Sequence, residues 1–192
     1  MQTSPSDIAA ALESGGFLQS VAGPDFDRVV AAGSALASGS ASALLLTGLA
    51  GCGKTLAASI LARIAFRRSE LPHMDARTIR CAAVTAFSAD GEIAPGVPVD
   101  CFRVARCGDI LLDDLGAETP VNVYGTPTDL VSEYLVNYCD EKKASRCIVT
   151  TNLNGSGILA RYGDRIFSRL AERFAWLDFT GGDKRVAKIR KF

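Results

Sequence analysis

The sequence predicts an α/β fold in which a parallel β-sheet is flanked by helices. Five short apolar segments have the composition of buried strands, and segments with helical patterning alternate with them along the chain. The first of these strands runs directly into a glycine-rich turn that opens a helix, and two later strands end in polar side chains. Because the carboxyl ends of parallel strands share one edge of a sheet, we expect the turn and the polar ends to meet there.

The elements follow one another in a regular order. Two helices are expected at 6–16 and 24–40, and the first stops at a pair of glycines. A continuous apolar run at 42–48, typical of a strand buried on both faces, precedes a helix at 54–68. The remaining strands are expected at 78–83, 109–114, 146–151 and 174–179, and the remaining helices at 99–106, 127–142 and 164–173. Residues 84–98 have no regular pattern.

The composition leaves the class of partner open. The 192 residues, 48% of them hydrophobic, suit one domain with a substantial core. Lys and Arg number 21, as do Asp and Glu, so the net charge neither favours nor excludes a nucleic-acid partner. The last nine residues hold five cations and no acid, a tail that could contact phosphates or simply be solvated.

The location is expected to be cytoplasmic. The chain has no apolar run of the roughly 18 residues that a membrane span needs, and its N-terminus lacks the basic and apolar regions of a secretory signal. The six cysteines form no C-x-x-C pair and are expected to be reduced thiols. The single histidine, His73, argues against a zinc site and against histidine-based nucleophilic catalysis.

The segment 48–55, GLAGCGKT, fits the phosphate-binding pattern G-x-x-x-x-G-K-T between a strand and a helix. Glycines permit positive φ, so that successive N–H groups point inward at an anion, and the helix N-terminus adds its positive dipole end. Lys54 can reach the β- and γ-phosphates, and the Thr55 hydroxyl can bind Mg²⁺. Residues expected to contact the nucleotide are Gly48, Ala50, Gly51, Cys52, Gly53, Lys54, Thr55 and Leu56. A glycine-rich turn without a ligand is the alternative, and Cys52 is interpreted as a small filler rather than a redox switch.

Two carboxylates, Asp113 and Asp114, end the strand at 109–114. Adjacent acids on a buried strand are costly unless a metal or hydrogen-bond donors compensate them. Asp113 can hold Mg²⁺ through water, and Asp114 can orient or deprotonate an attacking water. Glu118 is a weaker candidate for the second role.

Asn152 ends the strand at 146–151 and could hydrogen-bond the γ-phosphate or the attacking water. An asparagine that merely forms the turn after a strand is the alternative.

Arg165 and Arg169 lie four positions apart on the helix that follows, with Asp164 as its expected N-cap. A cation in the first turn opposes the helix dipole, and like charges at this spacing repel, so local stability does not explain the pair. One of the two could reach a neighbouring subunit's nucleotide as an arginine finger; the alternative is a solvated face with Arg169 paired to Glu172.

The chain resembles the AAA+ ATPases, specifically the DnaC/IstB-type ATP-binding proteins. The matching segments are LLLTGLAGCGKT, GDILLDDLGAE, IVTTNLN and YGDRIFSRLAERF, in family order over about residues 26–185. The resemblance implies Lys54 and Thr55 as the Walker A pair, Asp113 and Asp114 as Walker B, and Asn152 as sensor I. It also implies Arg169 as the first candidate for the finger and Arg165 as the second. The implied sheet has five strands with the phosphate strand central.

The resemblance also implies a domain layout and a function. A short helical extension (1–25) is expected before the ATPase core (26–185), followed by a basic tail (186–192) and no helical lid. Only about 25 residues precede the core, which departs from helicase loaders with a recruiting N-terminal domain. Arg185 is the one weak substitute for sensor II. Proteins of this group load replicative helicases or assist transposases, often as ATP-dependent oligomers on DNA.

The sequence therefore predicts a slow ATPase switch that uses ATP and Mg²⁺. We expect it to form homo-oligomers through Arg169 and to act on DNA or a DNA-bound helicase or transposase, with no membrane partner. It is expected to be slow because Asp114 is one methylene shorter than the glutamate that hydrolytic relatives often carry. A nucleotide-dependent scaffold with little turnover and a small-molecule P-loop kinase remain as alternatives.

Overall fold

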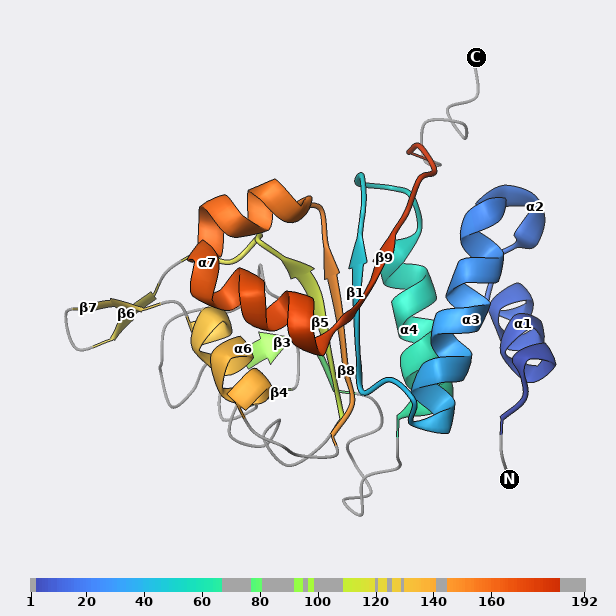
Figure 1. Ribbon diagram of the computed structural model, residues 1–192, viewed down its shortest axis with the longest axis horizontal. Coiled ribbons are helices and arrows are strands. Elements are labelled where there is room, and N and C mark those ends of the chain that lie inside the picture. The colour runs from blue at the N-terminus through green and yellow to red at the C-terminus, as the bar shows by residue number, and fades with distance from the viewer. Residues whose placement is uncertain are drawn as a thin grey trace.

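The structure is a computed structural model that describes residues 3–66, 77–80, 92–94, 97–98, 109–119, 121–123, 126–128, 130–140 and 145–183. Its main sheet is parallel and has the strand order β2-β5-β8-β1-β9 (Figure 1). These strands are β1 (Ala43–Thr47), β2 (Arg77–Arg80), β5 (Ile110–Leu115), β8 (Cys147–Thr151) and β9 (Ala175–Asp178). The predicted α/β class with a parallel sheet is therefore confirmed.

The strand before the phosphate turn is not the central one, which corrects the sequence expectation. β1 lies between β8 and β9, while β8 lies in the middle and pairs with β5 and β1. Every residue of β1 is still buried. Leu44 and Leu46 pack into one apolar cluster, and Ala43 and Leu45 into another. Two covered faces explain why this strand is a continuous apolar run.

Two layers of helices cover the sheet (Figure 1). One layer contains α1 (Pro5–Ser14), α3 (Pro24–Ser38) and α4 (Lys54–Ala65), and the short α2 (Gln19–Ala22) leads into α3. The other contains α6 (Leu130–Asp140) and α7 (Gly155–Arg173). The first helix is well capped, because Ser4 and Asp7 form a capping box and Pro5 occupies its first turn. Its Ile8 and Leu12 are buried in the same cluster as residues of α3 and α4.

Several predicted boundaries shift. The helix expected at 127–142 begins only at Leu130, because β6 (Val121–Val123) and β7 (Thr126–Thr128) form an antiparallel pair before it. Within the segment expected to be irregular, β3 (Glu92–Ala94) and β4 (Val97–Pro98) form a second short antiparallel pair. The helix expected at 99–106 lies outside the described residues. Within the described ranges, no helix combines the length and the apolar character needed to span a bilayer.

The helix α7 is bent into two arms at Gly163, whose φ of 77° and ψ of 171° are not helical (Figure 1). The predicted helix at 164–173 is its second arm, and the first arm was not predicted from the sequence. Asp164 is not the N-cap that was predicted, because Gly163 has the non-helical angles and Asp164 already lies inside the second arm. The N-cap of α7 as a whole is Asn154, whose side chain accepts a hydrogen bond from the Gly157 N–H at 2.8 Å. A glycine is suited to this bend because positive φ is costly for other residues.

Candidate nucleotide-binding site

The phosphate turn joins β1 to α4 in the conformation that its glycines permit. Gly48, Gly51 and Gly53 have φ values of 136°, 79° and 105°, and α4 begins at the next residue, Lys54. The turn also packs tightly, because a Cβ on Gly48 would lie 2.9 Å from both the Cβ and the carbonyl oxygen of Phe179. A glycine is therefore required at position 48, because its positive φ disfavours other residues and a Cβ would collide with Phe179.

The Lys54 ammonium is buried and holds the turn to the end of β8. The residue is 5% exposed. The Nζ donates to the carbonyl oxygens of Gly48 and Leu49, at 2.8 Å each, and to Asn152 Oδ1 at 2.9 Å. An ammonium has three donors, so the three oxygens satisfy it completely. Lys54 and Asn152, predicted separately from two motifs, thus lie in direct contact.

Thr55 and Asp113 form the second contact between the motifs. The Thr55 hydroxyl donates to Asp113 Oδ1 at 2.9 Å, and the Thr150 hydroxyl donates to the same oxygen at 2.8 Å. Asp113 is 5% exposed, and no cation among the described residues forms an ion pair with it. A hydroxyl and a buried carboxylate are the oxygen ligands that Mg²⁺ prefers, so this donor set fits magnesium.

A β-bulge in β5 lies at the two carboxylates, Asp113 and Asp114. Leu112 pairs with Val149 and Leu115 with Thr151, so β5 has one residue more than β8 over this stretch. Asp114 adopts φ 59°, and its N–H donates to the Thr150 hydroxyl at 2.9 Å. Leu112 and Leu115 consequently pack into the same cluster, on the α6 and α7 side, whereas Leu111 packs on the other side. Asp113 lies on that other side with Leu111, where it meets Thr55.

Thr150 is the site residue that sequence reasoning missed. Its hydroxyl donates to Asp113 and accepts from the N–H of Asp114, so it holds the bulge in place. The signal was the threonine pair before Asn152, which was interpreted only as a polar strand end. Its neighbour Thr151 donates to the carbonyl oxygen of Leu115 at 2.6 Å.

Glu118, the weaker candidate for activating water, is buried and fully engaged. Its side chain is 2% exposed. Oε2 accepts from the Gly116 N–H at 2.8 Å, while Oε1 accepts from the Tyr162 hydroxyl and lies 3.4 Å from two guanidinium nitrogens of Arg161. The carboxylate thus binds β5 to α7 rather than being free for water.

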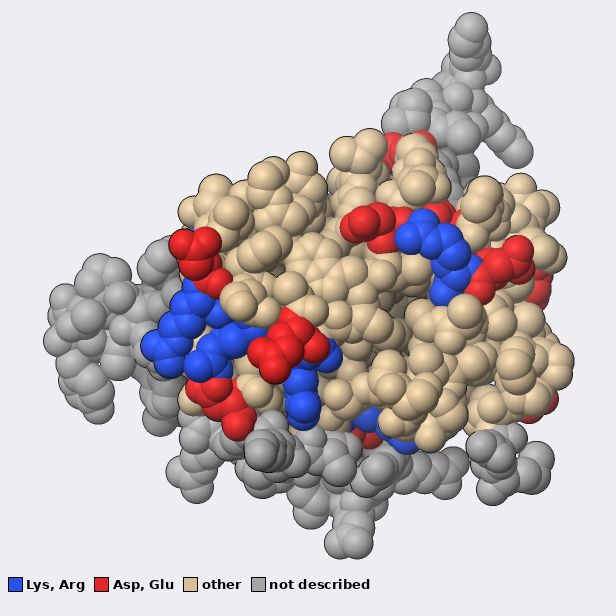
Figure 2. Space-filling view, viewed as in Figure 1, with Lys and Arg blue, Asp and Glu red and all other residues tan. Residues whose placement is uncertain are grey.

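The two candidate finger arginines differ in their surroundings. Arg169 forms an ion pair with Asp140 on α6, not with Glu172 as the alternative reading expected. Arg165 is exposed, and among the described residues it has no ion pair. Figure 2 shows basic side chains gathered over α6 and α7 with acidic ones among them. Within this chain, neither arginine contacts Lys54, Asp113 or Asn152 in the described part. Arg185 and the basic tail lie outside it.

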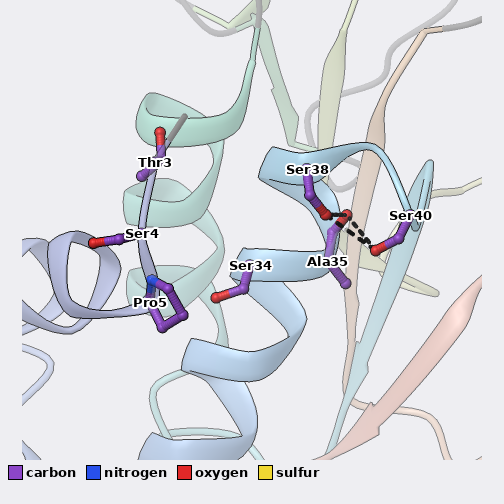
Figure 3. A pocket seen from close by; sticks show the side chains of 7 residues that line it. All are labelled: Thr3, Ser4, Pro5, Ser34, Ala35, Ser38 and Ser40. Carbon is purple, nitrogen blue, oxygen red and sulfur yellow. Dashed lines mark hydrogen bonds between the residues drawn. The ribbon is translucent and has the colours of Figure 1, made fainter. Parts of the chain in front are cut away.

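A hollow lies away from this site, between the start of α1 and the end of α3. Its volume is about 530 Å³ and its lining residues are Thr3, Ser4, Pro5, Ser34, Ala35, Ser38 and Ser40 (Figure 3). Ser34 donates to the Val30 carbonyl oxygen, and Ser38 and Ser40 both donate to that of Ala35. These hydroxyls satisfy the chain's own backbone, and the hollow lies beside the amino end of β1, whereas the phosphate turn follows its carboxyl end.

Comparisons with solved structures agree with this fold. The chain is similar to NtrX from Brucella abortus in complex with ATP (15% identity, TM-score 0.51) and in complex with ADP (17%, 0.51). These matches cover 81% of this chain but only 37% and 36% of NtrX, little more than a third of its length. A structure of the DnaC helicase loader is also similar, with 14% identity and a TM-score of 0.49 over 82% of this chain and 91% of that one.

No model of a protein family matches the chain, and a comparison with curated proteins finds no similar sequence. At these low identities the similarity to NtrX shows the fold.

Proposed function

We propose that this chain is a magnesium-dependent ATPase that works as a nucleotide switch. The single observation that carries the proposal is the convergence of three distant segments: Lys54 bonds to Asn152, and Thr55 bonds to Asp113. Nothing in the stability of a strand or a helix requires these four side chains at one edge of the sheet. Two solved structures of the same fold are in complex with ATP and with ADP, which supports a nucleotide as the ligand.

Each residue has a role that follows from its chemistry. The turn from Gly48 to Gly53 would bind the phosphates through backbone N–H groups, and Lys54 would exchange its carbonyl partners for phosphate oxygens. Thr55 and Asp113 would hold Mg²⁺, which neutralises charge on the phosphates when it is bound. Asn152 would remain beside the last phosphate and report its presence to β8.

Asp114 is the proposed base that orients the attacking water. It follows Asp113 directly, in the bulge at the end of β5. Its side chain is short, and its backbone is fixed by the bond from its N–H to Thr150. The same features favour a second candidate function, a scaffold that binds ATP and hydrolyses it very slowly. The two differ only in whether phosphate is released.

The partner is proposed from the resemblance to DnaC/IstB-type proteins. The switch would assemble as a homo-oligomer on DNA, or on a DNA-bound helicase or transposase. Arg165 is exposed and unpaired within the described residues, and is available to a neighbouring subunit. Arg169 would have to leave Asp140 first. This difference makes Arg165 a stronger finger candidate than its position in the sequence suggested.

The test is phosphate release from ATP by the purified chain, with and without single-stranded DNA. Hydrolysis that needs Mg²⁺ and is lost in Asp114→Asn supports the ATPase. Binding of ATP without phosphate release supports the scaffold. Transfer of phosphate to an added nucleoside would point instead to a kinase.

A further inference from the structure

The bend of α7 is held from outside the helix by one buried carboxylate. Arg161 and Tyr162, the last two residues of the first arm, both contact Glu118. The bend follows at once at Gly163. Burial, and after it the Glu118 carboxylate, raises the pKa of Tyr162 above its ordinary value, so the hydroxyl remains a donor at neutral pH.

The same carboxylate is bonded to the end of β5 that carries the magnesium site. Gly116, whose N–H donates to Glu118, follows Asp114 by two positions. Between them the chain is tightly fixed, because the Ala117 N–H donates to the Asp114 carbonyl oxygen at 3.0 Å and Leu115 accepts from Thr151. A Cβ on Gly116 would lie 2.8 Å from Leu153, so this turn has little room to absorb a movement of Asp113 or Asp114.

The bend itself does have room. A Cβ on Gly163 would meet no atom within 4 Å, so the point where the two arms join is not packed. The second arm carries Arg165 and Arg169. Glu118 fixes the end of the first arm to β5, so a shift at the proposed magnesium site would move the point from which the second arm starts. The open space at Gly163 gives the second arm room to change its direction.

We propose that Glu118 is a positioning residue that couples the Asp113–Asp114 end of β5 to the second arm of α7. Binding of ATP and magnesium would then set where Arg165 and Arg169 lie, and so whether they can reach a neighbouring subunit. The inference rests on the proposed nucleotide site, but it concerns a residue that need not touch the nucleotide. Glu118 would be expendable for binding and necessary for transmission.

The single tryptophan reports the second arm directly. Trp176 donates from Nε1 to the Leu170 carbonyl oxygen at 3.2 Å, and its ring meets that of Phe167 edge-on at 5.8 Å between centroids. Both partners are on the second arm. Its emission should therefore change when that arm moves.

The experiment measures ATP binding by calorimetry and Trp176 emission in parallel, with Mg²⁺ present. We expect the wild type to bind ATP and to change its emission. Glu118→Gln should bind ATP within about threefold of wild type, yet lose at least half of the emission change. Glu172→Gln, the same substitution on the exposed face of the second arm, is the matched control and should keep both.

If Glu118→Gln fails to fold, Tyr162→Phe is the variant that tests the coupling. It removes one donor to the Glu118 carboxylate and keeps the contact of that carboxylate with Arg161. A full emission change in either folded variant would overturn the coupling, as would a wild type that binds ATP without any emission change. Those results leave the proposed ATPase intact. Absence of ATP binding in the calorimeter would instead remove the proposed function and the coupling together.

Discussion

Lys54 and Asn152, which are 98 positions apart in the chain, are joined by a hydrogen bond of 2.9 Å from Nζ to Oδ1. The bond connects the start of α4 to the end of β8 and places an amide beside the ammonium expected to bind phosphate. An asparagine that only formed the turn after β8 would not need this bond to Lys54.

Asn152→Ala should lower ATP turnover by about tenfold or more, because a positioned polar group at the reacting phosphate is removed. Asn154→Ala is the control two residues away. It removes the N-cap of α7 and should cost about 1 kcal/mol of unfolding free energy while leaving turnover unchanged. Equal turnover losses in the two variants would indicate that Asn152 acts only through the local fold.

Asp113→Asn and Asp114→Asn should separate magnesium binding from hydrolysis. The first removes a ligand charge, so half-maximal activity should need a higher Mg²⁺ concentration, by about tenfold or more. The second should leave ATP affinity within about threefold and reduce phosphate release by about a hundredfold or more, the range of general-base catalysis. Unchanged phosphate release in Asp114→Asn would exclude Asp114 as the base, whereas a wild type that binds ATP and releases no phosphate would favour the scaffold.

Gly48→Ala should destabilise the fold more than Gly39→Ala, although both glycines have positive φ. Positive φ costs a non-glycine residue roughly 1–2 kcal/mol. A Cβ on Gly48 would also press on Phe179 at 2.9 Å, whereas one on Gly39 would meet nothing within 4 Å. Urea unfolding should show an extra loss of about 1 kcal/mol or more for Gly48→Ala. Equal losses would mean that the turn and the segment after β9 are not packed as described.

Stability should decline at alkaline pH because burial raises the pKa values of Tyr138 and Tyr162. An unfolded tyrosine titrates near about pH 10, so the unfolded chain loses these protons first. Their contribution is complete below about pH 10 and is lost as pH rises above it. Urea midpoints measured from pH 8 to 11 should fall above about pH 10, and less steeply in Tyr138→Phe. A wild-type midpoint that stays level to pH 11 would contradict the burial of these hydroxyls.

Arg165→Ala and Arg169→Ala should differ in ATP-dependent assembly. If Arg165 reaches a neighbour, its loss should abolish the oligomer formed with ATP and leave ATP binding by the monomer intact. Arg169→Ala should also break the ion pair with Asp140, a partly exposed contact worth about 1 kcal/mol or less. Light scattering with ATP, with ADP and without nucleotide measures the assembly of both variants. A monomer under all conditions in the wild type would remove the finger from the account.

The sequence predicted the parts of the fold that depend on local pattern. The apolar run of β1, the glycine turn and the paired acids at the end of β5 each carry a strong local signal. The strand order does not, because it depends on which apolar faces meet across the sheet, and β8 rather than β1 took the middle position. The contacts Lys54–Asn152 and Thr55–Asp113 followed from the rule that parallel strands present their carboxyl ends together.

The bulge and the bend of α7 were missed for a physical reason. Asp114 adopts positive φ, which a sequence cannot distinguish from an extended aspartate, although Asp tolerates it better than most residues. A helix was expected only at 164–173, and the first arm was not recognised because Gly155 and Gly157 weaken its helical pattern. The burial of Glu118 depends on α7 returning over β5, and no local signal reports that.

The central claim is that a nucleotide with magnesium binds between the Gly48–Thr55 turn and Asp113. Titration calorimetry of the folded chain with ATP and Mg²⁺ tests it most directly. The account predicts a saturable heat for the wild type. This heat should disappear when Mg²⁺ is replaced by a chelator, and it should be absent in Lys54→Ala. Trp176 emission checks that both proteins are folded. No saturable heat in the wild type, or an identical one in Lys54→Ala, would contradict it.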